Sequence, residues 1–255
     1  MTFSRKIRTL ATTVALLVPV TVHGAAAQAE ATTPLGKTEV EQIVRDYLLN
    51  NPEILLEVQE ALESKQREEQ KLAQQTVMKD KKEQIFNSPY DGVVGNPDAA
   101  VTVVEFFDYN CGYCKRAMDD MQALIEENDD VRFVLKEFPI LSAESREAHV
   151  VSMAVHAIAP DKYADFHQKL LGADTRANGE LAMKIATEAG IDESTLRKEM
   201  ENPEIQKVFA ETYDLANQLA VTGTPAYVIG EEVVFGALGK DVLAEKIDQA
   251  RTQDN

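Results

Sequence analysis

Apolar side chains between residues 36 and 62 recur every three or four positions, which is the spacing of amphipathic helices. The run Asn50-Asn51-Pro52 divides this segment into two helices, because it suits the end of one helix and the start of the next. Residues 63–71 then contain no apolar side chain, although helix-forming residues dominate. We therefore expect a helical segment at 30–62, followed by a polar helical linker at 63–88 that is exposed to solvent on all sides.

The apolar faces at 36–62 need a partner, because two short helices are too small to bury them alone. The polar linker separates these helices from the rest of the chain. We expect them to associate with further copies of the same chain and form a homo-oligomer. Packing back onto the main domain is the alternative that the sequence leaves open.

Residues 89–255 have the pattern of an α/β domain. The run VTVVEFF is nearly continuously apolar and rich in β-branched and aromatic residues, which is typical of a buried strand. A helical pattern and a second strand follow it, so a β-α-β unit is expected. From about 142 to 220 the pattern is helical throughout. The expected strands cover 101–107, 131–135, 226–230 and 233–236, and a last helix covers 240–250.

The first thirty residues have the pattern of an export signal. Basic residues at Arg5, Lys6 and Arg8 precede an apolar stretch, and small residues follow up to Ala29. The apolar stretch is shorter than the roughly 20 residues of a membrane-spanning helix. We expect residues 1–29 to be removed after Ala29, or after Ala27, and the mature protein to work where disulfides persist.

Charge limits the possible partners. The chain has 43 acidic and 26 basic residues, and its formal net charge is −17. No basic stripe offsets this charge, so nucleic acid and anionic membrane surfaces would be repelled. We expect no nucleic-acid partner.

The two cysteines of the chain, Cys111 and Cys114, lie two residues apart in FFDYNCGYCKRAM. A structural zinc site needs four protein ligands, and the histidines in the helical region have no ligand spacing, so we interpret His149, His156 and His167 as ordinary helix residues. A structural disulfide between the cysteines would close a very short loop and add only about 2 kcal/mol. Binding of Cu(I) by the two thiolates stays open.

Redox chemistry explains why the cysteine pair stands at the start of a helix. There the helix dipole and free N–H groups favour a thiolate, so Cys111 is the candidate nucleophile and Cys114 the resolving thiol. Glu105 interrupts the preceding strand, and it could exchange protons with Cys114 if it points into the core. The alternative is an exposed position on an edge strand. Thr224-Pro225 directly precedes a predicted strand, where a cis bond would explain the proline.

The stretches VEFFDYNCGYCK and GTPAYVIG together resemble the DsbA family of periplasmic thiol-disulfide oxidoreductases over about residues 93 to 252. The resemblance implies an α/β thioredoxin fold with an inserted helical domain at about 142–220. It also implies a periplasmic location and a redox-active disulfide between the two cysteines in place of a cofactor. By the resemblance, Glu105 is a buried acid, Lys136 lies near it, and Thr224-Pro225, with its cis bond, forms the wall that receives the substrate.

Gly112 and Tyr113 stand where strongly oxidising DsbA proteins have Pro-His. The pair resembles the site of the disulfide isomerase DsbC, which also has Thr before its cis proline. The N-terminal extension is similar to that of the ScsC branch (suppressor of copper sensitivity), where such extensions mediate oligomerisation. These likenesses imply an isomerase or reductase of misfolded exported proteins, kept reduced by a membrane-bound reductase of the ScsB or DsbD type. A DsbA-like oxidase, and a copper-tolerance protein that binds Cu(I) through Cys111 and Cys114, remain the alternatives.

Overall fold

A computed structural model describes residues 34–253 of the chain. The export signal expected at residues 1–29 lies outside the described residues. Among residues 34–253, no helix combines the length and the apolar character that crossing a membrane requires. The chain divides into two units, Met1–Leu56 and Glu57–Asn255.

The first unit contains helix α1, Lys37–Asn50, and the beginning of α2, Ile54–Asp80. The two helices and the break between them confirm the sequence prediction. At the break, the Asn51 side chain donates a hydrogen bond to the carbonyl oxygen of Tyr47 at 2.8 Å and so caps the end of α1. Helix α1 buries none of its residues. Its exposed apolar side chains include Val40, Ile43, Val44, Tyr47 and Leu49.

Helix α2 runs unbroken to Asp80, and a short helix α3, Lys82–Phe86, follows it. Its middle is exposed, as the polar pattern predicts. Its last turns are not, because Gln74 and Met78 are buried and the Gln74 amide donates a hydrogen bond to the carbonyl oxygen of Leu219 at 2.7 Å. Packing of the second unit therefore begins at Gln74, inside the linker expected at 63–88.

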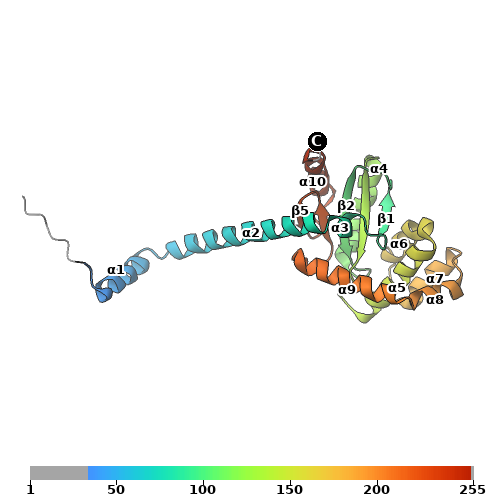
Figure 1. Cartoon of the computed structure of the whole chain (residues 1–255), viewed down its shortest axis with the longest axis horizontal. Coiled ribbons are helices and arrows are strands. Elements are labelled where there is room, and N and C mark those ends of the chain that lie inside the picture. Colours follow the sequence, from blue (N-terminus) through green and yellow to red (C-terminus); the bar gives the residue numbers. More distant parts are fainter. Residues whose placement is uncertain (1–33, 254–255) are drawn as a thin grey trace, which may run out of the picture. The chain divides into compact units, whose positions relative to one another are not determined.

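The second unit is built on a mixed sheet with the strand order β1-β3-β2-β4-β5 (Figure 1). Strands β2 and β3 are parallel and flank helix α4, and the other neighbouring pairs are antiparallel. The four strands and the β-α-β unit that the sequence predicts are confirmed. The strand bounds are Gly92–Gly95 for β1, Val101–Phe107 for β2, Val131–Glu137 for β3, Ala226–Ile229 for β4 and Glu232–Phe235 for β5, and α4 covers Gly112–Glu127.

Side chains of the central strand β2 alternate between two hydrophobic cores. Val103 and Phe107 lie in the core that includes α4 and α10, Lys240–Gln253. Val104 and Phe106 lie in the core on the opposite face, which includes α3 and the end of α9, Pro203–Gln218. Neighbouring positions of one strand therefore face different surroundings, and this decides which charged residues can reach the cysteines.

The helical region between β3 and β4 confirms the insert expected at about 142–220. Most of this region joins the core on the α4 side of the sheet, whereas the end of α9 lies in the opposite core. Within the region, α5 packs against α7 and α8. Figure 1 shows α6, α7 and α8 gathered beside the sheet, while α9 runs below it, and α6 contacts α4. The helices are α5, Ala143–Ile158; the 3-10 turn η1, Pro160–Lys162; α6, Tyr163–Leu171; α7, Gly179–Glu188; α8, Glu193–Met200; and α9.

Candidate redox site

The cysteine pair lies at the turn between β2 and α4. Cys111 is the N-cap of α4, and its backbone N–H donates to the carbonyl oxygen of Asp108 at 2.9 Å. Cys114 lies one turn further along the helix and is fully buried, whereas Cys111 keeps 7% of its surface exposed. Both thiols are free. An incoming group can therefore reach the first sulfur and not the second.

The surroundings of Cys111 favour its thiolate. The pKa of Cys111 falls from 9.0 to about 5, chiefly because the Cys114 thiol donates a hydrogen bond to its sulfur. Partial burial opposes this shift, and the backbone N–H groups of Cys114 and Tyr113 support it. Cys111 is therefore ionised at neutral pH, as a nucleophilic thiol must be.

Cys114 and Glu105 form the buried side of the site. Burial raises the pKa of Cys114 well above its ordinary value, and its bond to Cys111 and the charge of Glu105 raise it further. Glu105 lies on the central strand β2 and is buried, so the alternative of an exposed edge position is excluded. Burial, helped by the charge of Cys111, raises the pKa of Glu105 from 4.5 to about 8. A carboxyl group with this pKa can both accept and release a proton near neutral pH.

The loop before β4 forms the other wall of the site. The Thr224-Pro225 bond is cis, as expected. In its protonated form, the Cys111 thiol donates a hydrogen bond to the carbonyl oxygen of Thr224 at 3.2 Å. The Thr224 hydroxyl is buried and has no hydrogen-bond partner among residues 34–253 when Cys111 is a thiol. Once Cys111 is ionised, this hydroxyl can donate to the sulfur, which lowers the pKa of Cys111.

Sequence reasoning missed two polar residues that fix the turn before Cys111. The Asp108 carboxylate accepts hydrogen bonds from the backbone N–H groups of Ile140 and Leu141 at 2.9 and 3.0 Å. The Asn110 side chain accepts from the N–H of Ala177 at 2.8 Å and donates to its carbonyl oxygen at 2.9 Å. Their position in the sequence could have indicated this role. Polar residues between a buried strand and the cysteines are expected to be buried and to need hydrogen-bond partners.

A buried polar network lies behind the same turn, and it includes His149 of α5 and His167 of α6, two of the histidines interpreted from the sequence as ordinary helix residues. His149 accepts a hydrogen bond from the backbone N–H of Tyr109 at 3.2 Å through Nε2, so its Nδ1 carries the proton and donates to Glu137. Glu137 also accepts from Ser152 at 2.6 Å. His167 bonds to the Tyr109 hydroxyl at 3.2 Å, and burial lowers its pKa to about 3.

The expectation that Lys136 lies near Glu105 is wrong. In the sheet register Glu105 is opposite Leu135, whereas Lys136 is opposite Phe106 and faces the other core. There its ammonium pairs with Asp91 and donates to the carbonyl oxygen of Gln84. Alternation along the strand thus removes Lys136 from the redox site.

No group of three or more His, Cys, Asp or Glu side chains within residues 34–253 could hold a metal ion.

The sheet, the Cys-x-x-Cys pair at the first turn of α4 and the cis proline beside it define a thioredoxin-fold thiol-disulfide oxidoreductase. The chain belongs to the family described as the DSBA-like thioredoxin domain, which matches residues 102–248. Residues 37–69 match a second family, the copper resistance protein ScsC N-terminal domain.

Individual relatives agree with this assignment. Disulfide bond formation protein D of Bacillus subtilis is 28% identical over 167 residues, which are 62% of this chain and 75% of that protein. The crystal structure of a thioredoxin-like oxidoreductase from Silicibacter pomeroyi is 39% identical with a TM-score of 0.63, over 67% of this chain and 97% of that one. The crystal structure of Proteus mirabilis ScsC in a transitional conformation is 27% identical with a TM-score of 0.64. The match covers 85% of this chain and 97% of that one.

The chain also matches part of a longer protein. It is 23% identical over 160 residues to the Na(+)/H(+) antiporter NhaA 3 of Salinispora tropica, and the match covers 24% of that antiporter. The expected resemblance to the DsbA family and its ScsC branch is confirmed. The protein is a thiol-disulfide oxidoreductase of this type.

Proposed function

We propose that the protein is a periplasmic disulfide isomerase and reductase of misfolded exported proteins, with Cys111 as the nucleophile and Cys114 as the resolving thiol. The observation that carries this proposal is the pair Gly112-Tyr113 between the cysteines at the start of α4, which adds no cationic side chain there. A cation beside a cysteine stabilises its thiolate, and strong stabilisation of the reduced form makes a site strongly oxidising. A site without such a cation between its cysteines suits rearrangement and reduction of disulfides. The lowered pKa of Cys111, about 5, supports its role as the nucleophile.

The reaction begins when the Cys111 thiolate attacks one sulfur of a substrate disulfide. A mixed disulfide forms, the substrate disulfide breaks, and the second substrate sulfur leaves as a thiolate. In isomerisation, this thiolate attacks another disulfide of the substrate. A substrate thiolate finally displaces Cys111 from the mixed disulfide, so no electrons are transferred overall.

Reduction uses the buried half of the site. Cys114 gives its proton to Glu105 and attacks the Cys111 sulfur of the mixed disulfide. The Cys111–Cys114 disulfide forms, and the substrate leaves with two electrons. A membrane-bound reductase of the ScsB or DsbD type returns the pair to dithiols. Thr224 and Pro225, next to the Cys111 sulfur, receive the substrate segment.

Self-association through residues 36–62 completes the proposal. The exposed apolar side chains of α1 and the match of residues 37–69 to the ScsC N-terminal domain support it. Several sites around one misfolded substrate raise the effective concentration of thiolates, which favours repeated exchange over a single oxidation.

Recovery of activity from scrambled ribonuclease tests the function. The full chain is expected to restore activity, and Cys111→Ser to abolish it. Deletion of residues 30–70, which ends before the buried Gln74, should weaken isomerisation but leave oxidation of a simple dithiol unchanged. Equal isomerase activity of the shortened chain would contradict the role of the oligomer. A reduction potential near that of DsbA, about −120 mV, would instead favour a dithiol oxidase.

A second candidate function is binding of Cu(I) by the two free thiols. It is supported by their direct contact and by the description of the matched N-terminal domain, which names a copper resistance protein. Pro225→Ala separates the two functions, because metal capture does not need this proline. Loss of thiol exchange with intact Cu(I) binding is expected. Unchanged thiol exchange in Pro225→Ala would favour the copper function.

A further inference from the structure

The loop between α6 and α7 is attached to the Cys-x-x-Cys turn on both sides. On one side, the Asn110 amide makes two hydrogen bonds to the backbone of Ala177. On the other, the Lys115 ammonium donates to the carbonyl oxygen of Ala173 at 2.6 Å. These two anchors directly flank the cysteine pair in the sequence, so the loop lies along the turn. The side chains between the anchors, Asp174, Thr175 and Arg176, are exposed.

Tyr113, between the two cysteines, presents an exposed aromatic ring. Tyr113 keeps 59% of its surface exposed, while its backbone N–H donates to the Cys111 sulfur. The guanidinium carbon of Arg116 lies 4.4 Å from the centre of the Tyr113 ring. Such a stack offers an apolar face and a positive charge at once, and Tyr and Arg are the residues that interfaces favour.

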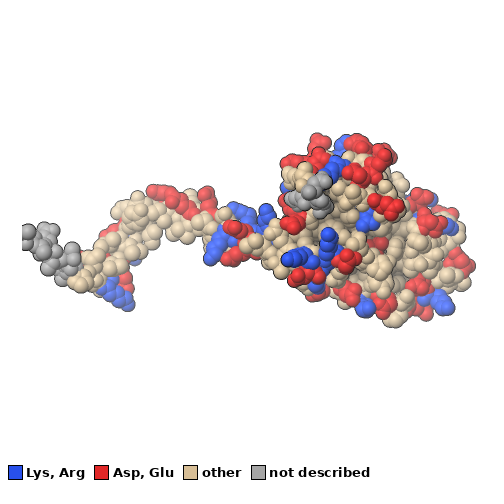
Figure 2. Space-filling view, turned by 45° about the horizontal axis from the view of Figure 1, so that its top comes forward, with Lys and Arg blue, Asp and Glu red and all other residues tan. Residues whose placement is uncertain are grey.

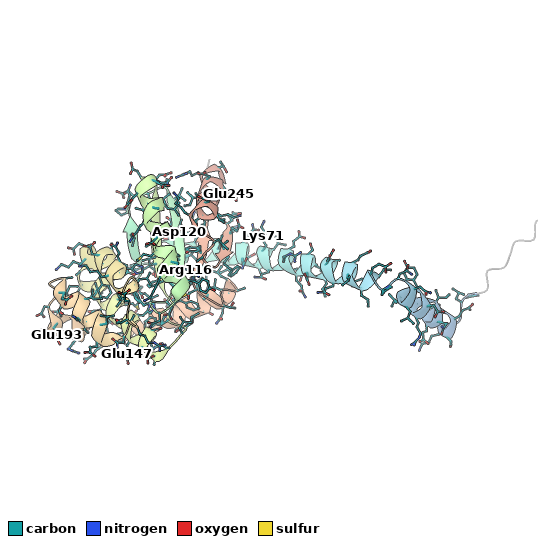
Figure 3. The ribbon with its side chains drawn as sticks, turned by 180° about the vertical axis from the view of Figure 1, so that it is seen from behind. Lys71, Arg116, Asp120, Glu147, Glu193 and Glu245 are labelled. Atoms are coloured by element: carbon teal, nitrogen blue, oxygen red, sulfur yellow. The ribbon has the colours of Figure 1, made fainter. Side chains whose placement is uncertain are left out.

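Two of the cations at this place, Lys115 and Arg116, form no salt bridge among residues 34–253. The carboxylates that follow on α4, Asp119 and Asp120, form no ion pair with them either. Arg176 differs, because it acts on Glu144, where local hydrogen bonds and then the charge of Arg176 lower the pKa of the carboxyl. Among the charged side chains visible in Figure 2, acidic ones are more widespread than basic ones, in keeping with the net charge of −17. Figure 3 shows Arg116 on α4 at the end nearer the helical region, with Asp120 one turn beyond it.

We propose that Tyr113, Arg116 and the loop Ala173–Ala177 form a substrate-binding surface, and that Arg116 makes the enzyme prefer disulfides whose cysteines are flanked by acidic residues. The proposal rests on the proposed function, since it concerns the segment held beside Cys111 in the mixed disulfide. Residues of a chain are 3.8 Å apart, so the neighbours of a substrate cysteine fall within reach of this surface. An exposed charge pair of this kind changes the rate by at most about fivefold.

Three disulfide-linked fluorogenic peptides of equal length test the proposal, with Asp, Ser or Lys on both sides of the cysteine. The kcat/KM for reduction by the full chain, with dithiothreitol as the final reductant, is expected to be about fivefold higher for the Asp peptide than for the Lys peptide at low salt. The ratio should shrink in about 0.5 M salt, because exposed charges are then screened. Arg116→Gln should bring the ratio close to one, and Arg116→Lys should retain most of it.

Arg197→Gln on α8 is the matched control, because Arg197 pairs with Glu193, which Figure 3 shows at the far edge of the helical region. This variant should keep the wild-type ratio. Three results would overturn the proposal. The first is a ratio of Asp-peptide to Lys-peptide kcat/KM near one for the wild-type protein, and the second is an unchanged ratio in Arg116→Gln. The third is an Arg116→Gln variant whose kcat/KM falls by the same factor for all three peptides. The Ser peptide distinguishes failure of the acidic preference from failure of the proposed function. If it is reduced while the ratio is near one, only the acidic preference fails; if no peptide is reduced, the proposed function fails.

Discussion

The Cys114 thiol donates a hydrogen bond to the sulfur of Cys111, and no other contact lowers the pKa of Cys111 as much. The donor keeps its proton because burial raises the pKa of Cys114 far above its ordinary value. The two thiols are therefore in opposite states, one ionised and exposed and the other protonated and buried. This difference fixes the order of events, since Cys111 must react before Cys114 can.

Removing the Cys114 donor should raise the pKa of Cys111. A hydrogen bond to a charged group contributes about 1.5–3 kcal/mol, which corresponds to a rise of about one to two pH units. We expect this rise in Cys114→Ala and a smaller one in Cys114→Ser, whose hydroxyl can still donate. The pH dependence of the rate of iodoacetamide alkylation measures it. A midpoint that stays near pH 5 in Cys114→Ala would contradict the assignment.

Glu105→Gln should change how the stability of the reduced protein depends on pH. The folded pKa of Glu105, about 8, lies above its ordinary value of 4.5. At Glu105 the folded state therefore binds more protons than the unfolded state between these pH values, and the Glu105 contribution to stability falls as pH rises from about 4.5 to 8, by at most about 1.4 kcal/mol per pH unit. Glu105→Gln should remove this fall and raise the Tm at pH 8. Cys111, whose folded pKa of about 5 lies below its ordinary value of 9.0, makes an opposite contribution that rises with pH and is present in both proteins.

Kinetics provide the second measurement on Glu105→Gln. Cys114 loses its proton acceptor, so the mixed disulfide between Cys111 and a substrate should persist longer and accumulate in acid-quenched samples. Alkylation of Cys111 in the first step should continue at neutral pH. A variant with unchanged pH dependence of its Tm and no accumulated mixed disulfide would show that Glu105 is not the proton acceptor.

Local patterns in the sequence were sufficient to predict most helices and strands and the redox role of the cysteine pair, because both depend on residues that are close in the sequence. They could not supply the register of β2 against β3, which sends Glu105 and Lys136 to opposite faces. They also could not pair Asn110 with Ala177, since these residues are far apart in the sequence. Contacts of this kind arise only when the helical region packs beside the turn.

The position of strand β1 and the end of the exposed linker also could not be predicted from local patterns. Strand β1 escaped the sequence analysis because its four residues, GVVG, are too short for an alternating pattern and half of them are glycine. The polar pattern predicted a linker exposed along its whole length, but the Gln74 side chain is buried and donates a hydrogen bond to the carbonyl oxygen of Leu219. A polar residue in a helix can be buried when a distant backbone carbonyl accepts its hydrogen bond.

Val44→Glu should weaken self-association of the full chain. Val44 is 52% exposed on the apolar face of α1, and burying a carboxylate in an interface formed by that face would be unfavourable. Gln42→Glu is the matched control, because it adds the same charge to the opposite face, where Gln42 bonds to Asp46. Sedimentation should show a lower mass for Val44→Glu alone. Equal masses for the two variants would exclude this face as the interface.

Asp91→Ala should destabilise the protein without changing the redox site. It leaves the buried ammonium of Lys136 without its carboxylate, and breaking a buried ion pair in this way costs about 3–5 kcal/mol. The free energy of unfolding in urea, measured at pH 7.5, tests this, because burial raises the pKa of Asp91 only to about 6 and the pair is then charged. Adding Lys136→Met should recover much of the loss, since no unpaired charge remains. Cys111 should still be alkylated with a midpoint near pH 5 in both variants. A shift of the Cys111 pKa by about one unit would mean that Lys136 acts on the thiolate despite facing the opposite core.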